Sequence, residues 1–315
     1  STPSNSSAAS DVYKRQVNCP FGAIADKSQI FQVIMAINAG DEVIAEVAPA
    51  FVGQFGGKGN VDKLREAFKQ LGFSGMEEVA LGADLCTIQE SEDFLEEVPE
   101  KIPFMGTSCC PAWSVMAKKE FPKNADCISM ALTPMTLTAR LIRKQHPNAK
   151  IVFVGPCSAK KLEAMRESVR SEVDFVLTFE EMAGMMSAKQ IDYTKLAGEG
   201  GDFDVASADG RGFAVAGGVA TAVANAIRKR YPEREVKVAN AEGLEECRKL
   251  MKDAVKGKYD GYLLEGMACP GGCVAGAGTL TAVNKTAAAV KRYAKTSPPV
   301  SYTHLRAHET AATLV

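Results

Sequence analysis

Four cysteines in three short loops are the residues of this chain best suited to chemistry. Cys110 lies in the segment TSCCPAW (107–113), Cys157 lies in GPCSAKK (155–161), and Cys269 and Cys273 lie in EGMACPGGC (265–273). Four thiolates are the ligand set that a cubane iron–sulfur cluster requires. A fifth cysteine, Cys109, stands beside the first of them, and a cluster with a purely structural purpose has no need of it.

Zinc is the main alternative to iron and sulfide for these thiolates. Zinc sites commonly use tightly paired ligands such as C-x₂-C, whereas the four cysteines here are dispersed and include one C-x₃-C pair, Cys269 and Cys273. Their loops are apolar and contain Gly or Pro, so that backbone N–H groups can donate to cluster sulfides. The spacing therefore favours an iron–sulfur cluster and leaves zinc as the competing interpretation.

Cys109 and Lys160 could add reactivity to a plain cluster. Because Cys109 and Cys110 are adjacent, their side chains diverge in an extended loop, and one thiol points away from the cluster. A thiol in a buried pocket can relay a proton, although a small buried apolar residue is the commoner fate of cysteine. Lys160 is either a solvated surface residue or, if it points inward, a hydrogen-bond donor to an anionic ligand.

The cysteine and histidine counts exclude several other classes of site. The nine cysteines are an odd number in a chain of 315 residues, which argues against a disulfide framework and for a reducing, cytoplasmic location. There are only three histidines, so chemistry built on histidine bases is nearly excluded. No motif supports Cys86, Cys127 or Cys247, which we expect to be small buried residues.

The charge and hydropathy patterns exclude nucleic acids and membranes as partners. The chain has 37 basic and 38 acidic residues, a net charge of -1, and no stripe of basic and aromatic residues. No apolar run approaches the roughly 20 residues that a transmembrane helix needs. We therefore expect no nucleic-acid binding and no membrane span.

Both ends of the chain differ from the sequence between them. Residues 1–16 and 296–315 have no periodicity and resemble translated sequencing-adaptor read-through, natural disordered tails being the alternative. Residues 17–26 (VNCPFGAIAD) resemble the end of a ferredoxin-type cluster segment. We interpret this segment as the remnant of a ferredoxin-like domain, with Cys19 as an orphaned ligand, and expect a single domain over 27–295.

Apolar periodicity in that domain alternates between strand-like and helix-like segments. Strands are predicted at 42–47, 102–105, 150–154, 173–178, 212–215, 236–239 and 262–264. Helices are predicted at 27–39, at 61–71 with Asn60 as its cap, from Pro111 onward, and at 179–188, 217–230, 240–256 and 278–294.

This alternation predicts an α/β fold with largely parallel sheets and flanking helices. We expect two lobes around a central cleft, about 27–145 with C-terminal elements and 146–264. Each cysteine loop directly follows an apolar strand, and open α/β sheets build their sites at the carboxyl ends of strands. The loops should therefore meet in the cleft.

Taken together, the three loops resemble the active-site motifs of the [FeFe]-hydrogenases. The family patterns are TSCCPxW, PCxxKxxE and ExMACxxGCxxGGG, and this chain has TSCCPAW at 107–113, PCSAKKLE at 156–163 and EGMACPGGCVAGAG at 265–278, in the same order. The segment FAVAGGV (213–219) also resembles the glycine-rich strand–helix turn of the family. The resemblance covers about residues 17–295.

The resemblance implies an H-cluster, in which a [4Fe–4S] cube is joined to a two-iron unit that carries CO, cyanide and a bridging dithiolate amine. Cys110, Cys157, Cys269 and Cys273 would hold the cube, and Cys273 would also bridge to the two-iron unit. The remaining implied site residues are Lys160 on a cyanide, Met267 over the two-iron unit, and Cys109 as the proton relay.

The family's proton path continues through a carboxylate, a hydroxyl and a second carboxylate. Glu90 and Ser129 fall near the expected sequence distances, and Asp93 is a candidate for the carboxylate at the surface. Both acidic residues could equally belong to a solvated helix face. Gln89 and Leu132 depart from common family residues, and so weaken this part of the resemblance.

Two further departures from the family pattern leave the activity open. Gly155 stands where the best-known members have methionine, and the third motif ends in Gly-Ala-Gly instead of Gly-Gly-Gly. The principal hypothesis is a catalytic hydrogenase that acts on protons and H₂, exchanges electrons with ferredoxin or a similar carrier, and receives its two-iron unit from maturation proteins. The alternatives are a non-catalytic H₂-sensing domain and a hydrogenase-like iron–sulfur assembly protein.

Overall fold

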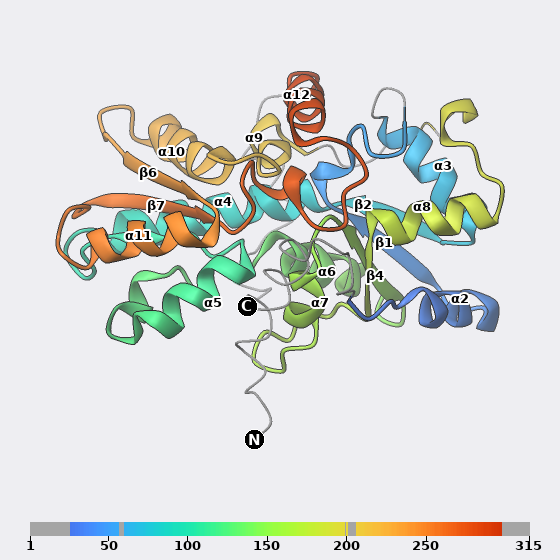
Figure 1. The fold of residues 1–315 in the computed structure, drawn as a ribbon, viewed down its shortest axis with the longest axis horizontal. Helices are drawn as coiled ribbons and strands as arrows, with labels where there is room; N and C mark the ends of the chain where they lie inside the picture. The colour runs from blue at the N-terminus through green and yellow to red at the C-terminus, as the bar shows by residue number, and fades with distance from the viewer. Residues whose placement is uncertain (1–25, 57–59, 199, 201–205, 298–315) are drawn as a thin grey trace.

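Two parallel β-sheets form the centres of two lobes (Figure 1). The computed structural model describes residues 26–56, 60–198, 200 and 206–297. The first sheet has the order β2 (Gly75–Glu78), β1 (Val43–Val47), β4 (Lys150–Gly155) and β5 (Phe175–Thr178). The second has the order β3 (Met105–Gly106), β7 (Tyr262–Met267) and β6 (Lys237–Glu242). The α/β class with parallel sheets is confirmed.

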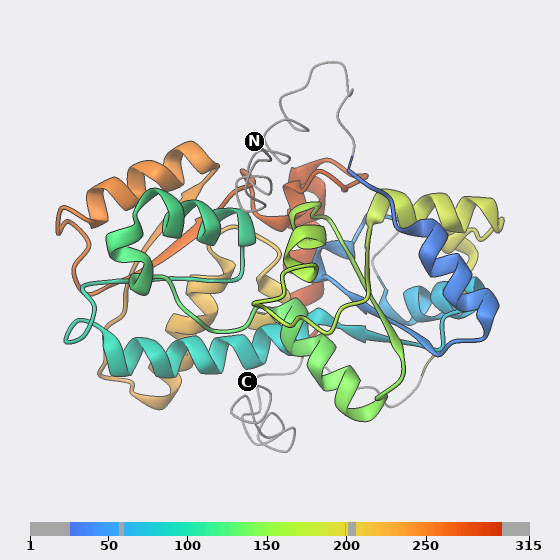
Figure 2. The ribbon, with the colours of Figure 1, turned by 90° about the horizontal axis from the view of Figure 1, so that it is seen from below.

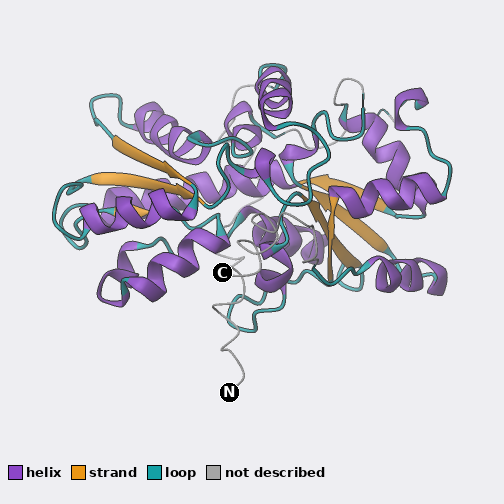
Figure 3. Ribbon diagram, viewed as in Figure 1, coloured by secondary structure: helices purple, strands orange, loops and turns teal. Residues whose placement is uncertain are grey.

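Helices cover the sheets of both lobes (Figure 3). Those around the first sheet and the centre are α2 (Ile30–Ala39), α3 (Val61–Leu71), α6 (Pro134–Gln145), α7 (Ala159–Ala164), α8 (Phe179–Ala188) and α12 (Val283–Ala294). The second lobe has α5 (Pro111–Glu120), α10 (Gly218–Arg230) and α11 (Leu244–Ala254), with the short α9 (Ala208–Gly212) near the centre. In the described part of the chain no helix is both long enough and apolar enough to cross a membrane.

The central strands are buried because helices cover the sheets. Every residue of β1 is buried, and so are five of the six residues of β4 and of β7. Strands of this kind read as continuous apolar runs instead of alternating ones, which is why the sequence pattern identified all three. Local capping also follows the sequence, since the side chain of Asn60 accepts from the backbone N–H groups of Asp62 and Lys63 at the start of α3.

The long helix α4 (Val79–Glu97) joins the two lobes (Figure 2). It begins directly after β2 of the first sheet, and Phe94 near its end packs in a buried cluster with Met105 and Leu263 of the second sheet. Helix α4 therefore passes the region between the lobes, where it can present side chains to a site that both lobes share.

Several sequence predictions are wrong or incomplete. Residues 213–217 form a turn instead of a strand: the carbonyl of Ala214 accepts from the N–H of Val274, and the N–H of Ala216 donates to the carbonyl of Gly271. The apolar run Phe213–Val215 is shielded from solvent because it packs beside the loop at 271–274. The last helix begins at Val283 instead of 278, and the sequence predictions contain no element that corresponds to β2, α4, α6, α7 or α9.

The division of the lobes also differs from the expectation. Each sheet takes strands from both sides of residue 145, because parallel strands are joined by crossover connections that place neighbours far apart in sequence. The predicted leader, the tail, Cys19 and most of the segment 17–26 lie outside the described residues.

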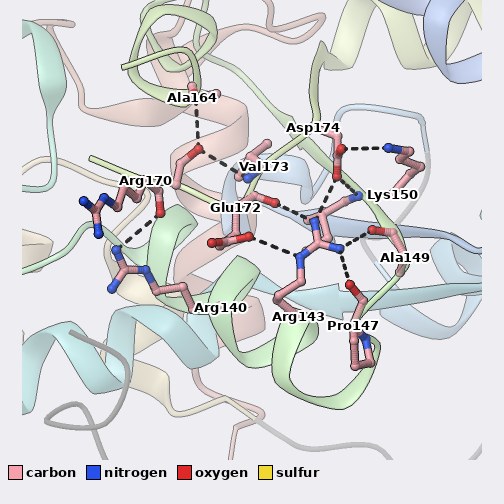
Figure 4. A network of polar contacts seen from close by, with 12 residues as sticks. Arg140, Arg143, Pro147, Ala149, Lys150, Ala164, Arg170, Glu172, Val173 and Asp174 are labelled. Atoms are coloured by element: carbon pink, nitrogen blue, oxygen red, sulfur yellow. Dashed lines mark hydrogen bonds and ion pairs between the residues drawn. The ribbon is translucent and has the colours of Figure 1, made fainter. Parts of the chain in front are cut away.

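A polar network fastens helix α6 to the loop before β5 (Figure 4). Arg143 donates to the carbonyl oxygens of Pro147 and Ala149 and to the carboxylates of Glu172 and Asp174. Arg140 donates to the carbonyls of Val169 and Arg170 in the same loop. Because this loop follows α7, the network holds α7 against α6 and so fixes the helix that carries Lys160.

Candidate functional site

The three cysteine loops meet in one pocket. It encloses about 770 Å³ of space between atoms, including its opening to solvent, and its wall is almost entirely apolar. The predicted site residues in its wall are Cys109, Cys110, Cys157, Lys160, Met267, Cys269 and Cys273. The structure therefore gathers five cysteines from three distant segments, as the position of their loops after parallel strands predicted.

The first loop is fixed by the tryptophan of its motif. Strand β3 ends at Gly106, and helix α5 begins at Pro111, so that Cys110 is the residue that precedes the helix. The indole N–H of the buried Trp113 donates to the carbonyl oxygen of Thr107 at 3.0 Å. A side chain at Gly266 would collide with the indole ring, so glycine is required there for β7 to approach α5.

The third loop depends on glycine. Gly271 and Gly272 have φ values of 101° and 87°, which L-residues rarely adopt. A Cβ on Gly272 would lie 2.5 Å from the backbone nitrogen of Ala216, and one on Gly276 would collide with the carbonyl oxygen of Pro156. These close approaches bring Cys273 beside the loop that carries Cys157.

Glu265 is a site-positioning residue whose purpose the sequence did not reveal. Its buried carboxylate accepts from the backbone N–H groups of Gly217 and Ala220, each at 2.7 Å. A carboxylate at a helix N-terminus satisfies otherwise unpaired donors and is stabilised by the helix dipole. Glu265 thus fastens the end of β7 to the start of α10 and to the turn at 213–217.

Lys160 points inward, which decides between the two readings of this residue. Its Nζ atom donates to Oε2 of Glu163 at 2.7 Å, to Oγ1 of Thr133 at 3.2 Å and to the carbonyl oxygen of Cys109 at 3.4 Å. Burial disfavours the ammonium, but Glu163 and nearby Cys157 raise the pKa of Lys160 above its ordinary value overall. The side chain therefore brings a positive charge to the pocket wall.

Burial in the same low-polarity wall keeps the thiols protonated. It raises the pKa of Cys157 to about 11 and that of Cys273 to about 12, and it also raises the pKa of Cys110 and of Cys109. Thiolates at these positions need a metal to hold them, because a coordinating cation lowers the pKa of its ligand. No three Cys, His, Asp or Glu side chains of the described residues converge closely enough to hold a single metal ion.

Glu90 lies next to the pocket and is fully buried, so it does not belong to a solvated helix face. Its Oε1 atom accepts from the backbone N–H of Ser108 at 2.9 Å and from the Ser108 hydroxyl at 3.1 Å. Burial raises the pKa of Glu90 to about 7, and hydrogen bonding from Ser108 and Ser129 offsets part of that effect. Ser108, which the sequence reasoning missed, is the residue before Cys109 and thus connects Glu90 to the first cysteine loop.

Ser129 and Asp93 lie near the same carboxylate. The hydroxyl oxygen of Ser129 accepts from the N–H of Ala131 at 3.1 Å, which leaves its O–H free to donate toward Glu90. Asp93 is partly exposed on α4, one turn after Gln89, whose side chain donates to it at 2.8 Å. Burial raises the pKa of Asp93.

The space beside Gly155 is occupied by the side chain of Phe153, which belongs to the same strand. A Cβ at this position would lie 2.5 Å from Cε1 and 2.6 Å from Cζ of Phe153, and 3.1 Å from Cβ of Ala48. Phe153 and Ala48 both line the pocket. The absence of a side chain at Gly155 therefore leaves no hole, because the ring of Phe153 occupies the place.

The family model described as "Iron only hydrogenase large subunit, C-terminal domain" matches residues 41–277. The chain belongs to this family. The match contains all three cysteine loops, α4, and every strand of both sheets.

Individual relatives of this domain include hydrogenases and iron–sulfur cluster assembly factors. The NADP-reducing hydrogenase subunit HndD of Solidesulfovibrio fructosivorans is 28% identical over 319 residues, 82% of this chain and 54% of that protein. The cytosolic Fe-S cluster assembly factor NAR1 of Debaryomyces hansenii is 32% identical over 142 residues, 40% of this chain and 26% of that protein. The chain spans about half the length of the curated hydrogenases it matches.

Solved structures share the fold of this family domain. A variant of the [FeFe]-hydrogenase HydA1 from Chlamydomonas reinhardtii matches with a TM-score of 0.70 and 21% identity, over 91% of this chain and 94% of that chain. At this level of identity the likeness concerns the fold. It agrees with the two parallel sheets and their helices and adds no residue roles.

Among the described residues, the three cysteines outside the motifs are buried as predicted. Cys86, Cys127 and Cys247 are each at most 4% exposed. The thiol of Cys247 donates weakly to the carbonyl oxygens of Ala241 and Met267, at 3.5 Å each. None of the three lines the pocket.

Proposed function

We propose that this protein catalyses the reversible reduction of protons to H₂ at an H-cluster. The observation that carries the proposal is the convergence of five cysteines, Lys160 and Met267 on one apolar pocket. The similarity to hydrogenases supports it, and so does the fold that the chain shares with a solved [FeFe]-hydrogenase. A cytosolic assembly factor of the same family shows that family membership alone does not decide the activity.

The donor set around the pocket fits the proposed cofactor. Cys110, Cys157, Cys269 and Cys273 would hold the cube, and Cys273 would also hold the two-iron unit. The glycines at 271, 272 and 276 permit the backbone approach that brings these thiols to one pocket. When bound, the cofactor would supply the redox chemistry of H₂ and protons at iron.

Lys160 and Met267 would orient the two-iron unit. The Lys160 ammonium has a carboxylate partner on one side and the pocket on the other, so it can donate a charge-assisted hydrogen bond to an anionic ligand. Met267 is 2% exposed at the end of β7 and offers an apolar, polarizable wall. Together they would fix a group that a single cysteine attaches.

Cys109, Glu90 and Ser129 would move protons. Cys109 lines the pocket, and Glu90 accepts a hydrogen bond from Ser108, the residue before Cys109 in the chain. A carboxyl whose pKa is about 7 exchanges protons readily at neutral pH. We propose that Cys109 Sγ gives protons to the pocket and recovers them from Glu90, with Ser129 beside it and Asp93 as the outer carboxylate.

Turnover of the cofactor-loaded protein tests this proposal. We expect H₂ production from a strong reductant, with infrared bands of metal-bound CO and cyanide. Cys109→Ala should reduce turnover by about 10²-fold to 10⁴-fold, the usual contribution of a proton-transfer group. Cys127→Ala, which removes a buried thiol away from the pocket, should retain turnover. A loaded protein with both sets of bands and no H₂ production would refute the catalytic proposal.

Two other functions have specific support. Gly155 stands where the best-known members of the family have methionine, and this difference favours an H₂ sensor with slow turnover and large infrared shifts under H₂. The similarity to NAR1 favours an iron–sulfur assembly protein. Such a protein would show no CO or cyanide bands after maturation, whereas a sensor would show both and turn over slowly.

The partners follow from the proposed reaction. Protons and H₂ are the substrates, a ferredoxin or similar carrier exchanges the electrons, and maturation proteins deliver the two-iron unit. We infer a cytoplasmic location from the reduced, metal-ligating use that we propose for the cysteines.

A further inference from the structure

Glu46 is a buried carboxyl group that the proposed reaction does not use. It is the penultimate residue of β1, is 0% exposed, and neither of its side-chain oxygens has a hydrogen-bond partner among the described residues. An ionised carboxylate in such a place is costly. Burial, and to a lesser degree the charge of Glu163, raises the pKa of Glu46 well above its ordinary value, although Lys160 acts in the opposite direction. Burial without a hydrogen-bond partner therefore favours the protonated form of Glu46.

The position of Glu46 is directly behind the pocket wall. The register of the sheet pairs Glu46 with Phe153 of β4, and paired residues of neighbouring strands share a face. Ala48 follows two residues later and so lies on this face too. Phe153 and Ala48 both line the pocket. A change in the charge of Glu46 would therefore be felt in the pocket through a medium of low polarity.

The charged groups that face Glu46 come from two elements. Lys160 and Glu163 on α7 act on it, and Glu77 on β2 shares its register. The buried residues of α6, which packs on β1, are apolar or threonine. Lys160 is thus the one cation near two buried carboxyl groups among the described residues, and it is paired with only one of them, Glu163.

One of the hydrogen bonds that the Lys160 ammonium donates is long and therefore weak. The bond to Glu163 is 2.7 Å long, whereas the bond to the carbonyl of Cys109 is 3.4 Å long. Exchanging the longer bond for one to an anionic ligand in the pocket costs little. That exchange is available only while no second carboxylate competes for the ammonium.

We propose that Glu46 is a positioning residue for Lys160. When Glu46 is protonated, the Lys160 ammonium is available to Glu163 and to an anionic ligand in the pocket. When Glu46 is deprotonated, the carboxylates of Glu46 and Glu163 share the ammonium and draw it away from the pocket. The inference rests on the proposed function, because the anionic ligand is a cyanide of the two-iron unit. It makes the protonation of Glu46 a condition for orienting that unit.

The first test needs no cofactor. Infrared spectra of the metal-free protein at pH 7 should show the C=O band of a protonated carboxylic acid, which is lost in Glu46→Gln and kept in Glu77→Gln, the partly exposed register partner. Glu46→Met, which also lacks an acid, should lose the same band if the glutamine variant does not fold. A spectrum in which the Glu46 variants keep every acid band of the wild type would overturn the protonated state.

The second test follows Lys160 in the cofactor-loaded protein. The cyanide bands of the wild type should shift as the pH is raised, with the same midpoint as the loss of the Glu46 acid band, and Glu46→Gln should abolish the shift. A shift of the same size in Glu46→Gln, or none in the wild type while its acid band disappears, would overturn the positioning claim. Absence of cyanide bands in every protein would refute the proposed function and leave the acid-band result standing.

Discussion

Replacing Gly155 with alanine tests whether Phe153 fills the place of a side chain at that position. The new Cβ would lie 2.5 Å from Cε1 of Phe153, about 1 Å inside the ordinary separation of roughly 3.5–4.0 Å between carbon atoms. The backbone of Gly155 is not left-handed, so the contact alone sets the effect. Overpacking of a dense core costs about 1–3 kcal/mol, and the alanine variant should lose that much free energy of unfolding.

A double-mutant cycle between positions 153 and 155 tests whether the Phe153 ring causes the loss of free energy of unfolding. Phe153→Leu removes the two closest of the three atoms that the Cβ would meet and leaves Cβ of Ala48 at 3.1 Å, so Gly155→Ala should cost less in the Phe153→Leu background. The coupling energy between the two changes should then be about 0.5–3 kcal/mol, the range for residues in contact. Denaturant unfolding of the four metal-free proteins measures it.

Gly184→Ala is the matched control for the alanine itself. Gly184 lies inside α8, and a Cβ there would meet no atom within 4 Å, so that change should stabilise the protein by about 0.5–1 kcal/mol. The reasoning is refuted if Gly155→Ala behaves like Gly184→Ala, or if the effects at 153 and 155 simply add.

Three further predictions concern the buried charges. Glu265→Ala leaves the N–H groups of Gly217 and Ala220 unpaired, and thermal unfolding should show a loss of about 2–4 kcal/mol. Lys160→Met leaves the buried Glu163 without its cation and should cost about 3–5 kcal/mol, most of which Lys160→Met with Glu163→Gln should restore. The pKa of Glu90 is raised to about 7 from an ordinary 4.5, so its contribution to stability is complete below pH 4.5 and is lost as the pH rises through 7. Glu90→Gln should therefore gain up to about 3 kcal/mol relative to the wild type between pH 4.5 and 8, and equal pH profiles would contradict this.

The strands and the cysteine loops could be predicted because their signals are local. Runs such as Ile151–Val154 are apolar throughout, as strands buried on both faces must be, and each is followed at once by a loop with Gly or Pro. The same logic failed at Phe213–Val215, where an apolar run is buried by the loop at 271–274 instead of by neighbouring strands. A single sequence does not distinguish an apolar run that is buried by neighbouring strands from one that is buried by a loop.

The partners of the site residues could not be predicted, because they are distant in sequence. Nothing near Ser108 in the chain indicates that its hydroxyl contacts Glu90, 18 residues earlier on a helix that joins the lobes. Nothing near Gly155 indicates that Phe153 bends back over it, since both are typical of a buried strand. The contact between Ser108 and Glu90 arises only when the crossover connections have placed the elements, whereas Phe153 is the exception in lying two residues from Gly155 on the same strand.

The arrangement of ionisable groups around the pocket follows one pattern. The wall is apolar apart from thiols and Lys160, and the carboxyl groups stand one residue behind it: Glu90 behind Cys109 by way of Ser108, and Glu163 behind Lys160. A carboxylate in the wall would compete with the thiolates for metal and would bring water with it. Behind the wall, each can still change the charge felt in the pocket, because a medium of low polarity screens weakly. In the proposed H-cluster site, this separation would let Glu90 exchange protons with Cys109 while the carboxyl group itself stays out of the space that the cofactor would fill.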